Sequence, residues 1–389
     1  MRRRPRRPCT SRRQLIVVTL LAVLLGKYVV TTRKEDSLSS FLLLSSEVST
    51  ATITEPPTTA SPLQRLNISG VDVLLQAPPS QPKGLLFLGH GCNHKNIEFF
   101  PPTQKDGVCP DCIGMPEEMA IVRIALQHFQ LVVAAFSSQG SCWKRKDADR
   151  VAPALKQIVD MYEQKSSINP LPILAFGASM GGDFVGTHLS MAMQQLGRPL
   201  TGFIAAIGEP DPLDYYNSLT TTNSKRPIRV PVAVYITMTR DKKLLKTTQR
   251  IVERLQEHNY PVQHIRIDPI SITDSFFHDR IAFMDPFFTQ ELSTKMVQAL
   301  TQAGLLTTTT NNNKILRVDP QSDVSWATPL RPLIPIEKDK FIYRTSPTWK
   351  VLNAAYARHE IARDGVQQAI EYIVLYQNDN KSQAGKVDD

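Results

Sequence analysis

The stretch LPILAFGASMGG at residues 171–182 constrains this chain more than any other. Its apolar first half ends in GASMG at residues 177–181, and a helical pattern follows. A G-x-S-x-G segment between a strand and a helix is the sequence form of a nucleophile elbow, a turn so sharp that the serine hydroxyl stands clear of the sheet. Glycines two residues before and after the serine remove side chains that would collide there. The pattern therefore predicts Ser179 as a nucleophile at a helix N-terminus, where free N–H groups face a developing oxyanion.

Apolar segments alternate with amphipathic ones on both sides of this motif. Strands are expected at 70–76, 83–91, 130–136, 171–176, 201–207, 230–239 and 262–270, and helices at 116–129, 147–164, 181–196 and 243–258. Continuous apolar strands that alternate with helices indicate a mostly parallel sheet covered on both faces. With right-handed crossovers, the result is a doubly wound α/β fold.

Composition divides the whole chain into five expected parts. They are a basic tail (1–14), a signal anchor (15–30), a Ser/Thr/Pro-rich stem (31–62), an α/β domain (63–304) and a C-terminal helical extension (305–389). Residues 209–229 lack periodicity and lie between two expected strands, which is a place for a lid or cap insertion. The helical pattern at 346–377 is expected to break near Asp364 and Gly365.

Arginines at the N-terminus supply much of the net charge of +9, since seven of them lie within residues 2–13 and no acidic residue occurs there. The globular part is therefore not strongly basic, and no nucleic-acid partner is expected. An apolar run at 15–26 follows the arginines and predicts a single-pass anchor, with the tail in the cytoplasm and the C-terminal domain in the lumen of the secretory pathway or at the cell surface. Secretion after cleavage of a signal peptide is the second interpretation, and a mitochondrial presequence the third.

Four of the five cysteines lie within 51 residues of one another, whereas Cys9 lies in the basic tail. Two disulfides among Cys92, Cys109, Cys112 and Cys142 suit an oxidising lumen, and a zinc site built from all four is the competing interpretation. The sequons at Asn67 and Asn380 are candidate glycosylation sites.

A nucleophilic serine needs a base, and the base needs an orienting acid. Asp241 follows the strand expected at 230–239 and is the candidate acid, although an aspartate before a helix is also a usual N-cap. His278 follows the next strand by a few residues and is the preferred base. His359 also follows Asp241 in chain order and is the alternative base, if the late helix folds back over the site.

Two backbone segments are expected to form the oxyanion hole. The first donor is the N–H of Met180, directly after the serine. The second comes from the loop GHGCNH after the strand at 83–88, where the N–H groups of Gly91 and Cys92 are the candidates. A disulfide between Cys92 and Cys142 is our hypothesis for what stiffens this loop.

These features together resemble the α/β-hydrolase superfamily over residues 83–304, because H-G, G-x-S-x-G, Asp and His occur in that order. The stretches HGCNH, CPDCIGMPEE, SCW and LNAAYARHE further resemble membrane-anchored α/β-hydrolase-fold proteins of plants and algae, up to about residue 377. The resemblance implies the fold and a serine-hydrolase apparatus with Ser179 as nucleophile and Asp241 as acid. It supplies no substrate. The chain departs from the usual pattern in carrying Cys92 where lipase-like enzymes have glycines, and in lacking a Gly-His pair at the base.

The sequence thus predicts an esterase-like serine hydrolase that acts through an acyl-enzyme. Its expected substrate is a small-molecule, lipid or glycan ester, and no metal or organic cofactor is implied. Two other functions fit the same residues. One is a non-catalytic hydrolase-fold ectodomain that binds a protein or glycan partner, and the other is an acyltransferase that uses the same triad.

Overall fold

The computed structural model describes residues 61–105, 107–164, 170–213, 229–343 and 345–384. The expected tail and anchor, nearly all of the stem, and most of the segment at 209–229 lie outside these residues. By its internal contacts the chain divides at residues 53 and 54, and the second unit contains everything described below. None of the helices in the described ranges combines the length and the apolar character needed to cross a membrane.

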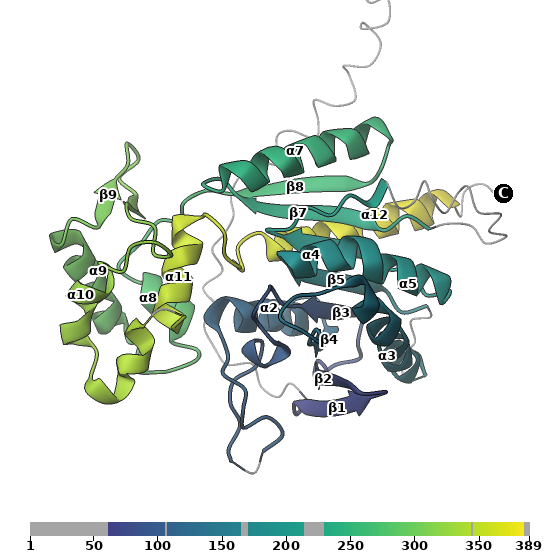
Figure 1. Cartoon of the computed structure of the whole chain (residues 1–389), viewed down its shortest axis with the longest axis horizontal. Coiled ribbons are helices and arrows are strands. Elements are labelled where there is room, and N and C mark those ends of the chain that lie inside the picture. Colours follow the sequence, from purple (N-terminus) through teal and green to yellow (C-terminus); the bar gives the residue numbers. More distant parts are fainter. Residues whose placement is uncertain (1–60, 106, 165–169, 214–228, 344, 385–389) are drawn as a thin grey trace, which may run out of the picture. The chain divides into compact units, whose positions relative to one another are not determined.

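An eight-stranded sheet is the centre of this unit (Figure 1). Its strands lie in the order β1-β2-β4-β3-β5-β6-β7-β8. Their bounds are Gln64–Ile68, Val71–Gln76, Gly84–Gly89, Leu131–Phe136, Ile173–Ala178, Gly202–Ala206, Val232–Met238 and Val262–Ile267 for β1 to β8. The pairings β4–β3, β3–β5, β5–β6, β6–β7 and β7–β8 are parallel. At one edge, β1 pairs antiparallel with β2, and β2 pairs antiparallel with β4. The mostly parallel sheet expected from the sequence is confirmed, with one extra edge strand, β1.

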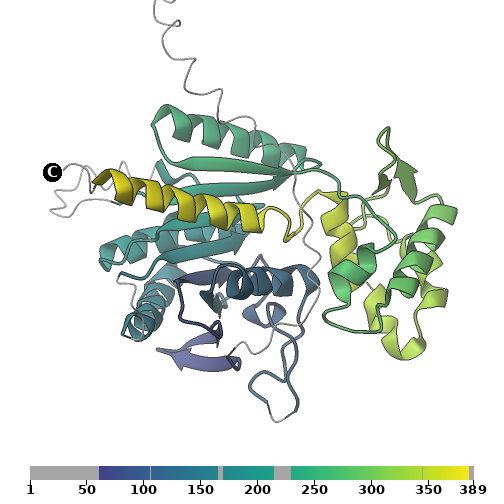
Figure 2. The ribbon, with the colours of Figure 1, turned by 180° about the vertical axis from the view of Figure 1, so that it is seen from behind.

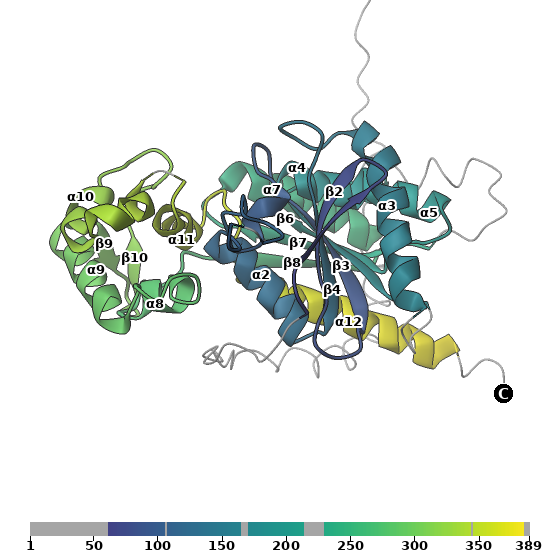
Figure 3. The same cartoon turned by 90° about the horizontal axis from the view of Figure 1, so that it is seen from below.

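Helices cover both faces of the sheet, as Figure 3 shows from below. On one face, α2 (Pro116–Gln127) and α12 (Val366–Ala384) pack in one apolar cluster with side chains of the central strands. On the other face, α3 (Arg145–Glu163), the helical segment at 180–195 and α7 (Lys242–Glu257) form a second cluster. Central strands β3, β4 and β5 are buried at every residue, which is why they read as continuous apolar runs.

A separate helical part lies between β8 and α12 (Figure 2). It contains α8 (Phe276–Ile281), α9 (Gln290–Gln302), the short pair β9 (Leu306–Thr308) and β10 (Lys314–Leu316), α10 (Ala327–Leu330), two 3₁₀ turns (Arg331–Leu333, Ile336–Ile342) and α11 (Pro347–Tyr356). Its own apolar cluster runs from Ile272 to Ala355. The expected division at residue 304 therefore cuts through this part, because α9 and β9 on either side of it share one core.

The long helical pattern at 346–377 forms two helices with an irregular segment between them. Helix α11 completes the helical part, whereas α12 returns to the sheet and contacts β6, β7 and β8. Ala357 ends α11 in the left-handed conformation, and Gly365, with φ +82°, precedes α12. The break expected near Asp364 and Gly365 is thus present. The loop at 357–365, which we call the return loop, carries His359 to the candidate site.

Candidate active site

The turn after β5 is as sharp as the sequence predicts. Ser179 has φ +52° and ψ −122°, a combination that is costly for any residue with a side chain. A Cβ on Gly177 would lie 2.0 Å from the carbonyl oxygen of Gly181, and one on Gly181 would lie 2.5 Å from that of His90. Both positions therefore require glycine. Helix α4 (Met180–Phe184) begins directly after the serine, which is half-buried and makes no hydrogen bond through its hydroxyl within the described part of the chain.

Asp241 and His359 meet although 118 residues separate them. His359 Nδ1 lies 2.8 Å from Asp241 Oδ2. Because the carboxylate accepts this hydrogen bond, the proton is on Nδ1 and Nε2 keeps its lone pair. The other oxygen of Asp241 accepts a hydrogen bond of 3.1 Å from the backbone N–H of Leu244 and so caps α7. Both roles considered for Asp241 from the sequence therefore coexist in one carboxylate.

His278, the preferred base from the sequence, lies elsewhere. It belongs to α8 in the helical part, where its Nδ1 donates to the carbonyl oxygen of Phe288 at 2.9 Å. It is not among the residues that line the pocket around Ser179, whereas His359 is. The structure therefore places His359, and not His278, in the pocket with Ser179. The physical reason is that the helical part separates β8 from the chain segment that returns to the carboxyl edge of the sheet.

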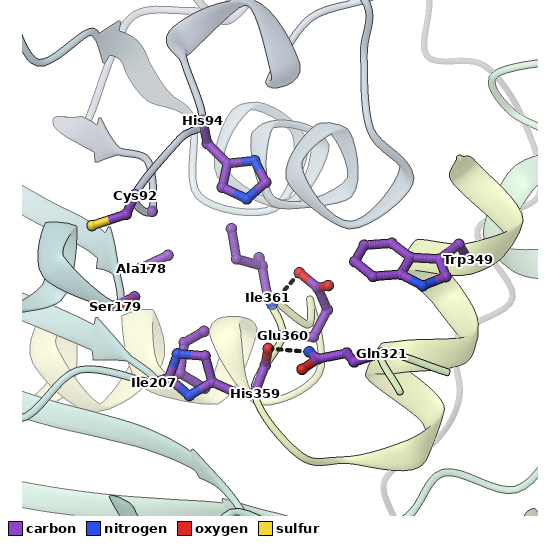
Figure 4. Close-up of a pocket in the computed structure, with 11 residues that line it drawn as sticks. Cys92, His94, Ala178, Ser179, Ile207, Gln321, Trp349, His359, Glu360 and Ile361 are labelled. Carbon is purple, nitrogen blue, oxygen red and sulfur yellow. Dashed lines mark hydrogen bonds between the residues drawn. The ribbon is translucent and has the colours of Figure 1, made fainter. Parts of the chain in front are cut away.

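Ser179 and His359 line one pocket of about 330 Å³ (Figure 4). The other residues that line it are Gly91, Cys92, His94, Ala178, Ile207, Gln321, Trp349, Glu360 and Ile361. The return loop is held over the pocket by a hydrogen bond of 2.8 Å from the Gln321 side chain to the carbonyl oxygen of His359. The sequence did not single out His94, Gln321, Trp349 or Glu360. Only His94 left a usable signal, its spacing of four residues from Glu98.

The loop after β3 lies against the serine on the side expected for the oxyanion hole. A Cβ built on Gly91 would lie 4.0 Å from Ser179 Cβ. The backbone N–H groups of Gly91 and Cys92 donate no hydrogen bond within the described residues. With the N–H of Met180 at the start of α4, these groups remain the candidate donors.

Buried His90 holds the loop after β3 in place through two hydrogen bonds. Its Nε2 accepts a hydrogen bond from the backbone of Ser138 at 3.0 Å, so the proton is on Nδ1, which donates to the carbonyl oxygen of Gly91 at 2.6 Å. Burial lowers the pKa of His90, which keeps the ring neutral. The indole N–H of Trp143 donates to the carbonyl oxygen of His90 at 2.8 Å. The loop is thus tied to the segment after β4 at several points.

Both expected disulfides are present, and the hypothesised pairing is among them. Cys92 bonds Cys142, and Cys109 bonds Cys112. The first bond joins the candidate oxyanion loop to the segment after β4, whereas the second closes a small loop before α2. The four cysteines are therefore paired rather than gathered into a zinc site.

We expect loss of the Cys92–Cys142 bond to cost more stability than loss of the other. It joins residues separated by 50 positions, against three for Cys109–Cys112. Loop-closure entropy then gives about 4 kcal/mol for the first and about 2 kcal/mol for the second. Denaturant unfolding of the C92S/C142S and C109S/C112S double variants measures both. An equal loss in the two variants would contradict this prediction.

Two sets of buried charges hold the return loop and the helical part against α2. In the first, Lys350 of α11 lies 2.9 Å from Glu360 and 3.4 Å from Glu118. Burial works against the ammonium, but the two nearby carboxylates outweigh it and raise the pKa of Lys350. Burial raises the pKa of Glu118. Glu118 in the first turn of α2 is therefore part of a buried ion pair.

The second set contains Arg280, which lies 2.7 Å from Glu117 and 2.8 Å from both carboxylate oxygens of Asp364. Glu117 also accepts a hydrogen bond of 2.8 Å from the backbone of Arg363. These contacts join α2, α8 and the end of the return loop. The segment directly after His359 is therefore fixed by ion pairs at Glu360 and Asp364.

Replacing Lys350 by methionine is expected to destabilise the fold by about 3–5 kcal/mol, because it leaves buried carboxylates without their cation. Lys295→Met is the matched control. Lys295 is exposed and pairs with Glu291 one turn away, so its loss should change stability by no more than about 0.5 kcal/mol. Denaturant unfolding of both variants tests this. Equal midpoints would show that the buried set does not stabilise the fold.

The structure describes the side chain of Asn67, the first of the two sequon asparagines, but not that of Asn380. Asn67 is exposed at the end of β1, and its side-chain oxygen accepts a hydrogen bond of 3.0 Å from the backbone of Gly70. Asn380 belongs to α12, and its side chain is outside the described residues. Glycosylation of either remains a prediction.

Strand order, the sharp turn after β5, an aspartate after β7 and a histidine between β8 and the last helix together give the architecture of the α/β-hydrolase fold. No protein-family model matches the sequence, and no curated protein matches it.

Similar solved structures include an arylesterase, with a TM-score of 0.38 and 16% identity over 56% of this chain and 79% of that chain. A bacterial heroin esterase has a TM-score of 0.37 and 16% identity over 55% and 77%. An esterase of Pyrobaculum calidifontis has a TM-score of 0.39 and 12% identity over 64% and 87%. The assignment of the fold rests on the topology and the turn described above.

Proposed function

We propose that this protein is a serine hydrolase that cleaves carboxylic esters. Ser179 is the nucleophile, His359 the general base and Asp241 the residue that orients the imidazole. The observation that carries the proposal is that the Asp241-bound ring of His359 lines the same pocket as the strained Ser179. Asp241 fixes the tautomer that presents the Nε2 lone pair, which is the form able to take a proton from a serine hydroxyl.

The reaction proceeds in two halves. Ser179 Oγ attacks the ester carbonyl carbon while its proton passes to His359 Nε2, and the backbone N–H groups of Met180 and of Gly91 or Cys92 bind the oxyanion. The bond from carbon to the alcohol oxygen then breaks, and His359 returns the proton to the departing alcohol. Water attacks the acyl-enzyme with His359 again as base, which releases the acid and restores the serine.

The site of action that we propose is the lumen of the secretory pathway or the cell surface, with residues 15–30 as a membrane anchor. Two disulfides in one domain support an oxidising compartment, because such bonds are rare where thiols are kept reduced. The run of arginines before the anchor supports a cytoplasmic N-terminus.

The experiment that tests the proposed reaction is hydrolysis of 4-nitrophenyl acetate and butyrate by the purified domain from residue 61 onward, together with the full chain. We expect steady turnover that follows an initial burst of 4-nitrophenol when deacylation is slower than acylation. A folded protein that releases 4-nitrophenol no faster than buffer would contradict the proposed reaction.

A further inference from the structure

Three side chains of the pocket have no part in the proposed reaction. They are His94, Glu360 and Trp349, and they come from the loop after β3, the return loop and α11. In Figure 4 the ring of His94 and the carboxylate of Glu360 reach into the pocket from opposite sides, and Trp349 lies beside them. An imidazole, a carboxylate and an indole thus line one pocket together with the serine.

The His94 ring is held in place by Glu98. Its Nδ1 lies 2.6 Å from Oε2 of the largely buried Glu98, which fixes the ring and leaves Nε2 for the pocket. A Cβ on Gly91 would lie 3.4 Å from His94 Cδ2 and 4.0 Å from Ser179 Cβ, so the ring is a close neighbour of the serine. The hydrogen bond to Glu98 raises the pKa of His94 and so favours the form in which Nε2 carries a proton.

Glu360 is held as an acceptor. Its Oε1 accepts hydrogen bonds from Lys350 at 2.9 Å and from the backbone of Ile361 at 3.0 Å. Its Oε2 has only a long contact of 3.4 Å with the Asn353 side chain within the described residues. A carboxylate oxygen accepts more than one hydrogen bond, so Oε2 retains capacity for a ligand.

Trp349 supplies an apolar face of fixed orientation. Its indole N–H donates to the carbonyl oxygen of Pro320 at 3.0 Å, and its backbone is held by the N-cap Ser346. The polar edge of the ring is thus occupied, and the small exposed part of the indole contributes apolar surface to the pocket.

An alkyl chain in this pocket would displace the water that hydrogen-bonds to His94 and Glu360. Because it offers no hydrogen bonds in return, its binding would carry a cost in free energy. A sugar ring has neighbouring hydroxyl groups that both accept and donate, and a C–H face that packs on an aromatic ring. We propose that the pocket takes the ester of a sugar or a related polyol, in which one hydroxyl accepts from His94 Nε2 and another donates to Glu360. This inference rests on the proposed ester hydrolysis and names the alcohol part of its substrate.

The test compares two acetate esters of primary alcohols, methyl 6-O-acetyl-glucoside and hexyl acetate, by their kcat/KM. The wild type is expected to prefer the sugar ester at least tenfold. His94→Phe keeps an aromatic ring but removes the donor, and is expected to lower this preference at least fivefold. Lys295→Gln, an exposed change on α9, is the control and should leave the preference unaltered.

Dependence on pH gives a second measurement that survives if His94→Phe fails to fold. The charged groups that act on His94 are Glu98 on its own loop, Glu118 from α2 and Lys350 from α11, with buried His90 at the end of β3 and Glu360 across the pocket. Nε2 donates only while His94 is protonated, so the preference for the sugar ester should fall as pH rises. The same Ser179 and His359 act on both esters, so the ratio of the two kcat/KM values isolates the contribution of His94.

Glu98→Gln removes the charge that raises the pKa of His94, so the preference should fall at a lower pH in this variant than in the wild type. Equal kcat/KM for the two esters in the wild type, or a preference that His94→Phe and Glu98→Gln both leave intact at every pH, would overturn the inference while ester hydrolysis stands. If neither acetate is cleaved and the 4-nitrophenyl esters are also stable, the proposed function fails and the inference fails with it.

Discussion

Replacement of Ser179 by alanine is expected to lower kcat for ester hydrolysis by about 10⁴-fold or more. The reason is that Ser179 carries the only hydroxyl at the turn between β5 and α4. In the proposed reaction the ester carbonyl of the substrate lies there, in the pocket that the His359 ring also lines. The fold should survive, because the Ser179 hydroxyl makes no hydrogen bond among the described residues and its loss leaves nothing buried unpaired. Hydrolysis of 4-nitrophenyl acetate measures the first point and thermal unfolding the second.

Ser275→Ala is the matched control for this variant. Ser275 also precedes a helix, but its hydroxyl donates to Asp279 in the helical part and lies outside the pocket. Its kcat should stay within about twofold of the wild type, as expected for a change at a half-buried residue away from the site. A Ser179→Ala enzyme that retains more than a tenth of wild-type kcat would remove Ser179 from the chemistry.

The second large expected effect is a loss of kcat/KM on replacement of His359, but not on replacement of His278. His359→Gln is expected to lower kcat/KM by about 10³-fold or more, because glutamine cannot take up the serine proton. His278→Gln should leave kcat/KM within about threefold, because His278 contacts the Phe288 carbonyl inside the helical part instead of the pocket. Kinetics of both variants on one 4-nitrophenyl ester decide between the two bases.

The comparison is informative in either direction. If His278→Gln abolished activity and His359→Gln did not, the base would be the one that the sequence favoured, and the helical part would have to close over Ser179 in a manner different from the structure. If neither mattered, the pair of Asp241 and His359 would be a structural contact that caps α7 and holds the return loop.

Much of the sheet is readable from the sequence because burial on both faces leaves no polar alternation. The strands at 84–89, 131–136 and 173–178 are buried throughout, and their apolar runs could only be central strands or buried helices. The turn at 177–181 is readable for a different reason. Two glycines are needed there on steric grounds, and steric requirements leave a fixed spacing in the sequence.

The sequence did not predict which histidine lines the pocket with Ser179, and the cause is topological. His359 follows β8 in the chain, but the helical part, with its own apolar core, lies between them in the sequence. Distance along the sequence from Ile267 then says nothing about which histidine comes back to the sheet. The sequence predicts the end of the return loop, near Asp364 and Gly365, but not its beginning at Ala357, so His359 was expected on a helix instead of a loop.

The buried ion pairs were equally hidden. Glu117 and Glu118 occupy the first turn of α2, where exposed carboxylates are usual, and nothing local distinguishes them from a favourable interaction with the helix dipole. Their partners Arg280 and Lys350 lie more than 160 residues further along the chain. Only the fold brings them together, and it thereby gives the return loop a defined position.

The central claim is that Ser179 is a nucleophile activated by the pair of Asp241 and His359. A fluorophosphonate probe reacts with a serine only when its hydroxyl is activated, and mass spectrometry of peptides from the labelled, folded protein identifies the modified residue. The account predicts one adduct, on Ser179, with labelling slowed by His359→Gln but not by His278→Gln. A folded wild-type protein that stays unlabelled, or that carries its adduct on another serine, would contradict it and leave a hydrolase-fold ectodomain with a binding function.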